Sequence, residues 1–159
     1  MNEMPFSPNE IFLSYPLGIR YNLLLHYESK SGNADFMRDV LPYQREASKI
    51  ENIFVERNLK GAELEKAGQI DEAIKLYEQN VTDFVDTPHP YDRLRVIYTK
   101  LKQYDDAIRV CQAYVKGSKL LSEAIKTELG NSKLAKELGN PLGFPDWVVK
   151  LKQKKGKTG

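Results

Sequence analysis

Apolar residues recur at steps of three and four positions through most of the chain. Between residues 42 and 68 they follow the period of a helix with one buried face, and Pro42 is acceptable near the start of such a helix. Gly68 ends this stretch, because glycine adopts the positive φ of a tight helix stop without a Cβ clash. The pattern therefore predicts a long helix whose apolar positions are Ile50, Ile53, Phe54, Val55, Leu59, Ala62 and Leu64.

Two further helices are expected after Gly68. The second runs from about Ile70 to Phe84, with its apolar positions on one face. The sequence DTPHP at residues 86–90 interrupts the pattern, because Asp or Thr can cap a new helix and the prolines cannot continue the previous one. The third helix then follows, with the apolar positions Tyr91, Leu94, Ile97, Tyr98 and Leu101.

The pattern continues beyond a short turn at Lys102–Gln103. A fourth helix begins near Tyr104 and is expected to stop at Gly117. A fifth is expected over residues 120–138, where Gly130 ends or bends it. The sequence GNP at residues 139–141 is a clear stop, and a short segment with Trp147 and a lysine-rich tail follows it.

The first 37 residues show no long period. One helical turn is expected after Ser7–Pro8, since serine can cap a helix and proline suits its first position. Residues 19–27 are a short apolar run, too short for its period to distinguish a strand from a helix. We expect residues 1–37 to be an irregular segment packed on a helical domain at 38–139, with residues 140–159 as a C-terminal segment.

The stretch from Asn58 to Tyr114 contains one pattern twice. GAELEKAGQIDEAIKLYEQ begins at Gly61, and RVIYTKLKQYDDAIRVCQ begins at Arg95, which is 34 residues later. A repeat at a fixed period in this range is typical of a stacked helical array. The aligned pairs are Leu64 with Tyr98, Ile70 with Tyr104, Ala73 with Ala107, Ile74 with Ile108, Leu76 with Val110 and Tyr77 with Cys111.

This pattern resembles the tetratricopeptide repeat over residues 54–117, with Gly68 at the family's central glycine. Ala73 and Ala107 stand where the two helices of each repeat cross, and small residues there let the helices approach closely. The resemblance implies an all-α, right-handed stack of antiparallel helix pairs. Two repeats cannot bury their own apolar faces, so residues 38–53 and the helix after Ser118 are expected to cap them. The departures from the family pattern are Arg57, Lys60, Asn80, Arg95, Lys102 and Tyr114.

The resemblance also implies a hollow face, lined mainly by the first helix of each repeat. Such grooves bind an extended or helical peptide. Some family members hold a C-terminal carboxylate there with a lysine and asparagines, but Asn58 and Ala62 stand at two of those positions, so that clamp is not expected. The alternative is that these faces are simply solvated. The candidate residues are Val55, Asn58, Ala62, Glu65, Lys66, His89, Asp92, Val96, Thr99 and Lys100.

Charge adds one local feature. The net charge of +2 gives no strong overall attraction to nucleic acid or anionic membrane. The excess of lysine lies in the tail, which is either a solvated C-terminus or a weak contact for phosphate or a membrane surface, with the apolar residues 147–149 as its foot. A third interpretation packs Trp147 back onto the last helix. The tail lysines are Lys150, Lys152, Lys154, Lys155 and Lys157.

Reactive residue types are few. Cys111 lies on the apolar face of a repeat helix, which favours a small buried hydrophobe over a reactive thiol. His26 and His89 are far apart, so no metal site, cofactor or catalytic motif is expected. One cysteine allows no internal disulfide, which fits a reducing cytosol, and neither a secretory signal nor a membrane-spanning stretch is visible.

We therefore expect a non-enzymatic, cytoplasmic scaffold or adaptor module. Its partner would be a protein or peptide bound in a helical-repeat groove. Three alternatives stay open: self-association through an exposed terminal face, an accessory role on nucleic acid or an anionic membrane through the lysine tail, and a regulatory or catalytic component whose chemistry the sequence does not show.

Overall fold

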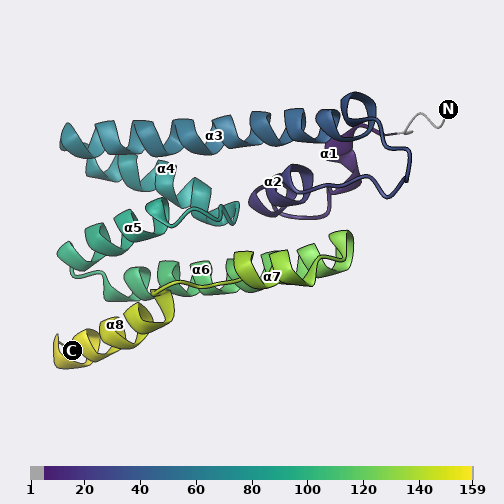
Figure 1. Ribbon diagram of the computed structural model, residues 1–159. Coiled ribbons are helices and arrows are strands. Elements are labelled where there is room, and N and C mark those ends of the chain that lie inside the picture. The colour runs from purple at the N-terminus through teal and green to yellow at the C-terminus, as the bar shows by residue number, and fades with distance from the viewer. Residues whose placement is uncertain (1–5, 159) are drawn as a thin grey trace.

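Residues 6–158, the part of the chain that the computed structural model describes, are mostly helical and contain no strand. The predicted all-α fold is confirmed. Four helices succeed one another in the middle of the chain: α3 (Leu41–Lys66), α4 (Ile70–Thr82), α5 (His89–Lys100) and α6 (Tyr104–Ala124). Each packs on the next, and α8 (Phe144–Thr158) packs on α6, as Figure 1 shows from top to bottom.

The helices α4, α5, α6 and α8 enclose the first of two apolar cores. The alanines at the two predicted helix crossings, Ala73 and Ala107, are fully buried in it. Tyr91, Tyr114 and Phe144 pack ring against ring where α5, α6 and α8 meet. The remaining buried members are Tyr77, Val81, Leu94, Ile97, Tyr98, Ile108, Val110, Cys111 and Leu151.

The turns α3–α4 and α5–α6 have the same backbone geometry, 34 residues apart. Gln69 donates from its backbone N–H to the carbonyl of Leu64 at 2.8 Å, and Gln103 donates to that of Tyr98, also at 2.8 Å. Between them, Gly68 has a φ of 77° and Lys102 a φ of 59°. Both turns are Schellman caps with a left-handed residue, so the sequence period is repeated in the backbone.

Lys102 carries a side chain where the equivalent turn has glycine, so the two turns allow a matched test. An L-residue in the left-handed conformation costs about 1 kcal/mol relative to glycine. Lys102→Gly is therefore expected to raise the free energy of unfolding by about 1 kcal/mol, and Gly68→Lys to lower it by a similar amount. Urea unfolding followed by circular dichroism measures both, and equal stability of all three proteins would contradict the assignment.

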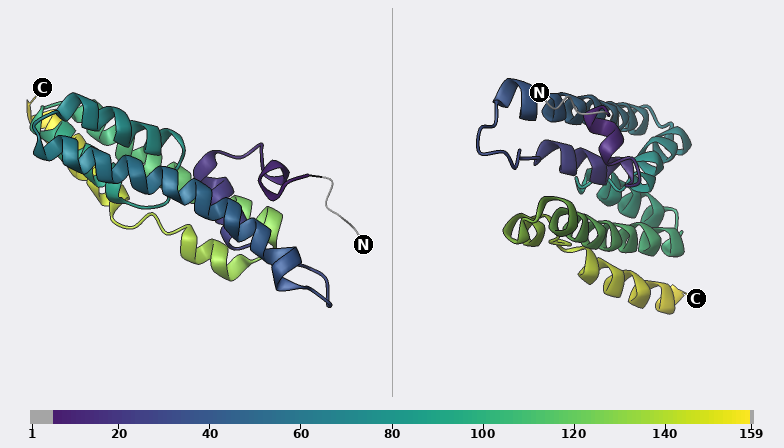
Figure 2. Two further views of the ribbon diagram at one scale, coloured as in Figure 1. Left: turned by 90° about the horizontal axis from the view of Figure 1, so that it is seen from above. Right: turned by 90° about the vertical axis from the view of Figure 1, so that its right-hand side faces the viewer.

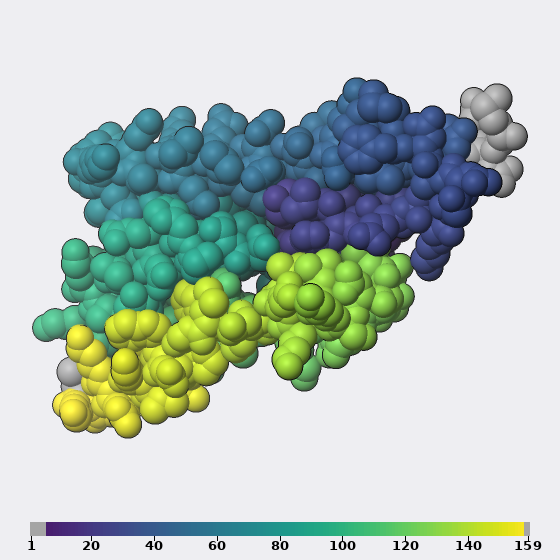
Figure 3. All heavy atoms as spheres, in the orientation of Figure 1, coloured from purple at the N-terminus to yellow at the C-terminus, as the bar shows by residue number. Residues whose placement is uncertain are grey.

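The N-terminal residues build a second core rather than an irregular coil. α1 (Pro8–Ile11) is capped by Ser7, and Glu10 closes the capping box by accepting the Ser7 backbone N–H at 2.8 Å. The apolar run that the sequence left open is a helix, α2 (Leu17–Leu25), which inserts Leu23 and Leu24 between the helices around it. In Figure 3 this segment fills the space between α3 and the C-terminal part of α6 with α7 (Ser132–Leu138).

The second core lies at one end of the long helices. α3 enters it with its first half, after a π-helical turn η1 (Phe36–Val40) that Asp35 caps, and α6 enters it with its second half. Figure 2 shows α1, α2 and α7 gathered at this end and α8 towards the other. The buried members are Phe12, Ile19, Leu23, Leu24, Tyr43, Ala47, Ile50, Phe54, Val85, Leu121, Ala124, Ile125 and Ala135.

The prediction that Gly117 ends the fourth helix is wrong. α6 continues through it to Ala124, adds the π-helical segment η2 (Ile125–Leu129), and ends at Gly130 in the left-handed conformation. Gly117 serves a close approach instead, because a Cβ atom there would lie 2.8 Å from Cδ1 of Phe84. The predicted fourth helix is therefore continuous with the part of the fifth before Gly130, and the rest of the fifth is α7, which begins after Gly130.

The turn between α4 and α5 is the point where the two cores meet. Phe84 has a φ of 54°, unusual for a bulky residue, and the neighbouring carbonyl of Asp83 accepts the backbone N–H of Gly18 at 2.7 Å. A Cβ atom on Gly18 would lie 2.3 Å from the carbonyl oxygen of Phe84. α2 can therefore start against this turn only if residue 18 is glycine.

Gly18→Ala is expected to lower the free energy of unfolding by about 3 kcal/mol, because the backbone atoms that it meets can yield only by moving the turn. Gly143→Ala is the matched control, since no atom lies within 4 Å of a Cβ built there. Urea unfolding of both variants measures the difference. Equal losses would show that α2 does not depend on this contact.

Candidate binding face

Helix α5 is joined to α3 on one side and to α8 on the other, in each case through an arginine. Arg93 donates from Nη2 and Nε to the carboxylate of Glu65 on α3, at 2.6 and 3.1 Å. Arg95 lies over the indole of Trp147 on α8, with its Cζ 3.7 Å from the ring centroid. The two arginines leave α5 in different directions and mark the edges of the surface between them.

Asp92, Val96 and Thr99 lie on the strip of α5 between these edges. Successive helical residues are rotated by about 100°, so the three positions fall within about 60° of one another. All three are partly exposed, and the Asp92 side chain keeps 47% of its accessible surface. Three of the residues predicted to line a hollow face are thus brought together on one accessible strip, which we call the α5 strip.

Glu65, also a candidate, is bonded to other side chains of the protein at the edge of the α5 strip. Besides the Arg93 contact, it accepts a hydrogen bond from the Tyr77 hydroxyl at 2.7 Å. Burial raises the pKa of Glu65, but the hydrogen bonds from Arg93 and Tyr77 outweigh it and hold that pKa below its ordinary value. Glu65 therefore stays ionised at neutral pH and connects α3 with α5.

Asn58 faces the contact between α3 and α4 and is half-buried there. Its Oδ1 accepts from Nδ2 of Asn80 at 2.9 Å, and the same Nδ2 donates to the Phe54 carbonyl at 3.1 Å. Asn80 is fully buried, and its Oδ1 accepts from Nη1 of Arg57 at 3.0 Å. Two departures from the repeat pattern, Arg57 and Asn80, are therefore bonded to each other.

The other five candidates are spread along α3 and α5. On α3, Val55 is exposed, Ala62 is half-buried and Lys66 is exposed in the last turn. On α5, Lys100 is exposed in the last turn, while His89 is exposed at the first residue, with its ring 5.8 Å edge-on from Tyr77. The structure places these five outside the α5 strip or at its ends.

The tail lysines belong to a helix that packs on the rest of the protein, and all five are exposed on it. α8 runs antiparallel to α6, since Phe144 stacks on Tyr114 at 4.2 Å near its start and Lys155 pairs with Asp105 near its end. Trp147 packs on the first core, whereas the third interpretation places it on the last predicted helix, at residues 120–138. The apolar foot of residues 147–149 does not exist as a unit, because only Val149 is largely exposed, at 56%.

Sequence reasoning missed α8 although its signal is present. Phe144, Trp147, Val148 and Leu151 stand at i, i+3, i+4 and i+7, the spacing of one helix face. These four side chains pack on the first core. The signal is short and lies between a proline-containing loop and a run of lysines.

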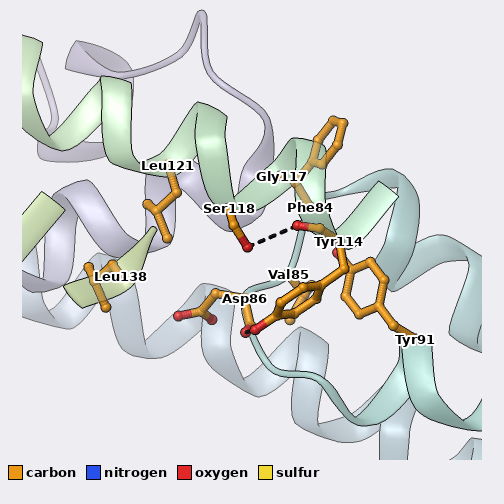
Figure 4. A pocket seen from close by; sticks show the side chains of 9 residues that line it. All are labelled: Phe84, Val85, Asp86, Tyr91, Tyr114, Gly117, Ser118, Leu121 and Leu138. Carbon is orange, nitrogen blue, oxygen red and sulfur yellow. Dashed lines mark hydrogen bonds between the residues drawn. The ribbon is translucent and has the colours of Figure 1, made fainter. Parts of the chain in front are cut away.

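Two hollows lie away from the α5 strip, near the second core. The first holds about 10 Å³, room for one water molecule at most; in Figure 4 it lies among Tyr91, Tyr114, Ser118 and the α4–α5 turn. Tyr114 donates to the Asp86 carbonyl there at 3.2 Å. The second, of about 240 Å³, is a half-open cleft between residues 15–19 and residues 120–127. Neither hollow contains a predicted site residue.

Reactive side chains form no cluster in the part of the chain that the structure describes. His, Cys, Asp and Glu residues there make no group of three or more that could hold a metal ion. Cys111 is fully buried on α6, and burial raises the pKa of its thiol to about 12. The thiol therefore stays protonated at neutral pH, which makes it a poor nucleophile.

Cys111 gives a simple test of the first core. At pH 8 the native thiol is both inaccessible and protonated, since pH 8 lies well below its raised pKa. Ellman's reagent is expected to react with the native chain only as fast as the chain opens, and at once in concentrated urea. The measurement is the absorbance at 412 nm over time. Immediate reaction of the native chain would contradict the burial of Cys111.

No helix within residues 6–158 is long and apolar enough to cross a membrane. Comparison with models of protein families, with curated protein sequences and with solved structures finds no match to this chain. A functional assignment for this chain therefore rests on its own geometry.

Proposed function

We propose that this chain is a non-enzymatic, tetratricopeptide-like module that binds a protein or peptide on the face formed by α3, α5 and α8. The 34-residue repetition of the turns at Gly68 and Lys102, with a buried alanine one turn into each following helix, supports the family resemblance. α8 runs parallel to α5 and antiparallel to α6, which is the place of the first helix of a third pair. Such an arrangement fits a right-handed stack.

The accessible α5 strip is the observation that carries this proposal. Asp92, Val96 and Thr99 combine an apolar side chain with polar neighbours, and helices on both sides hold α5 through arginines. A rigid surface of this kind binds with little loss of conformational entropy. The module would act as a scaffold or adaptor whose helices are already in their bound positions.

The N-terminal helices leave this surface open. α1 and α2 contact α3, α6 and η2 at the end of the molecule where the second core lies. Their apolar side chains are used in that core, as with Leu23 and Leu24. A partner could therefore reach the α5 strip without displacing them.

The lysines of α8 favour one second candidate, an accessory factor that contacts nucleic acid. Lys150, Lys152 and Lys157 form no ion pair with any residue in the described range. A membrane role has less support, because the apolar residues beside these lysines are mostly packed on the first core.

Val96→Gln tests the proposed function without changing charge. Peptides selected from a random display library against the full chain are expected to lose affinity about tenfold, since one buried valine contributes about 1.5 kcal/mol. Val149→Gln is the matched control, an exposed valine on the outer side of α8. Fluorescence anisotropy of labelled peptides gives both affinities.

The proposal fails if selection yields no peptide. It also fails if the selected peptides bind the Val96→Gln variant as well as they bind the unchanged chain. Comparable losses in the two valine variants would place the binding surface elsewhere on the module.

A further inference from the structure

Two cations share one indole where α5 meets α8. Arg95 lies with its Cζ 3.7 Å from the Trp147 ring centroid, and Lys150 lies with its Nζ 4.9 Å from the same point. The Arg95 side chain is only 15% exposed, so it is held in one place. The stacked guanidinium still has N–H groups along its edge that can donate to a carboxylate. We call these three residues the Trp147 seam.

The positive charge of the Trp147 seam is only weakly neutralised. Among residues 6–158, Arg95 forms an ion pair only with Asp92, at 3.4 Å from both Nε and Nη2, which is long for a charge-assisted hydrogen bond. Lys150 pairs with no carboxylate among residues 6–158. The stretch from Trp147 to Lys157 holds five lysines and no acidic residue. A negatively charged group from outside would therefore find two ready partners here.

Charge at the C-terminal ends of α3, α5 and α8 is mainly basic. Their last turns carry Lys66, Lys100 and Lys157, beside the exposed Glu63 in the last turn of α3. Lys155 of α8 pairs with Asp105 of α6. Basic residues in a last turn complement the helix dipole. Because α3, α5 and α8 share one face, that face has more basic than acidic residues along this rim.

We propose that the partner is an acidic peptide segment, and that the Trp147 seam receives its Asp or Glu side chains while its apolar residues lie on Val96. This inference rests on the proposed function, and it adds the chemistry of the partner. Binding of such a segment requires no C-terminal carboxylate, because Arg95 and Lys150 can hold a side-chain carboxylate at any point along it.

The geometry favours a peptide over nucleic acid. A single strand needs an open aromatic face on which a base can stack, and the ring of Trp147 already has Arg95 and Lys150 against it. The α5 strip also presents the carboxylate of Asp92, half-exposed beside the seam. A continuous row of phosphates would pass close to this carboxylate, whereas a peptide can place an uncharged side chain there.

Trp147 is the only tryptophan in the chain, so its intrinsic fluorescence reports directly on the seam. The probe is an eight-residue peptide of glutamates interspersed with leucines and blocked at both ends, and the comparison is the same peptide with glutamine in place of every glutamate. The acidic peptide is expected to change the Trp147 fluorescence until the site is saturated. It should bind at least tenfold more tightly than the glutamine peptide. Its affinity should fall with added salt, because salt screens exposed charges.

Two variants locate the site. Lys150→Gln is expected to weaken the acidic peptide about tenfold, because it removes one of the two cations of the seam. Arg95→Lys keeps the charge but loses the planar fork, so an intermediate loss is expected. Lys75→Gln, the same change at an exposed lysine on α4, is the matched control and should leave binding unchanged.

The outcomes separate this inference from the proposed function. Equal binding of the acidic and glutamine peptides, with both weakened by Val96→Gln, would overturn the inference and leave the proposed function standing. A single-stranded oligonucleotide that binds more tightly than the acidic peptide and loses affinity in Lys150→Gln would overturn it in favour of nucleic acid. The absence of any fluorescence change with the acidic peptide would also overturn it.

Discussion

The close packing of the α4–α5 turn against two other helices holds this structure together. At Phe84 the chain turns in a left-handed conformation, and Gly18 of α2 and Gly117 of α6 both come too near for a side chain. The first core lies on one side of this turn and the second on the other, with Val85 buried in the second. Because α3 and α6 extend through both, the position of the α5 strip depends on packing some distance from it.

Arginines and helix ends shape the candidate face. Arg93 and Arg95 fix α5 against its neighbours, and what remains between them is a narrow surface rather than a deep pocket. The charges on its rim follow from an elementary rule, since basic residues suit the C-terminal ends of helices and acidic residues the N-terminal ends. The C-terminal ends of parallel helices on one side of a layer therefore bring basic residues together.

Much of the fold is visible in the sequence, because the α3–α6 helices have long, regular apolar faces, and Gly68 and the prolines at 88 and 90 mark two of the breaks between them. α2 could not be predicted, since a nine-residue apolar run has no decisive period. The prediction of a helix end at Gly117 was wrong for a physical reason. Glycine permits both a helix stop and a close contact, and only the position of Phe84 decides which applies. Of the candidate face, Asp92, Val96 and Thr99 share a strip, whereas Asn58 and Glu65 are engaged within the protein. No pattern in the sequence predicts that Arg95 stacks on Trp147, which is 52 residues away.

The placement of α2 has a consequence for the order in which the chain can fold. α2 leaves the ribosome before α6, yet it packs on α6, about 100 residues later in the chain. Contacts at such separations form slowly because the intervening chain must first be ordered. The middle helices can pair as they emerge, since tight turns join them. α2 can pack on α3 earlier, but the second core that buries Leu23 and Leu24 is complete only after α6 has been synthesised.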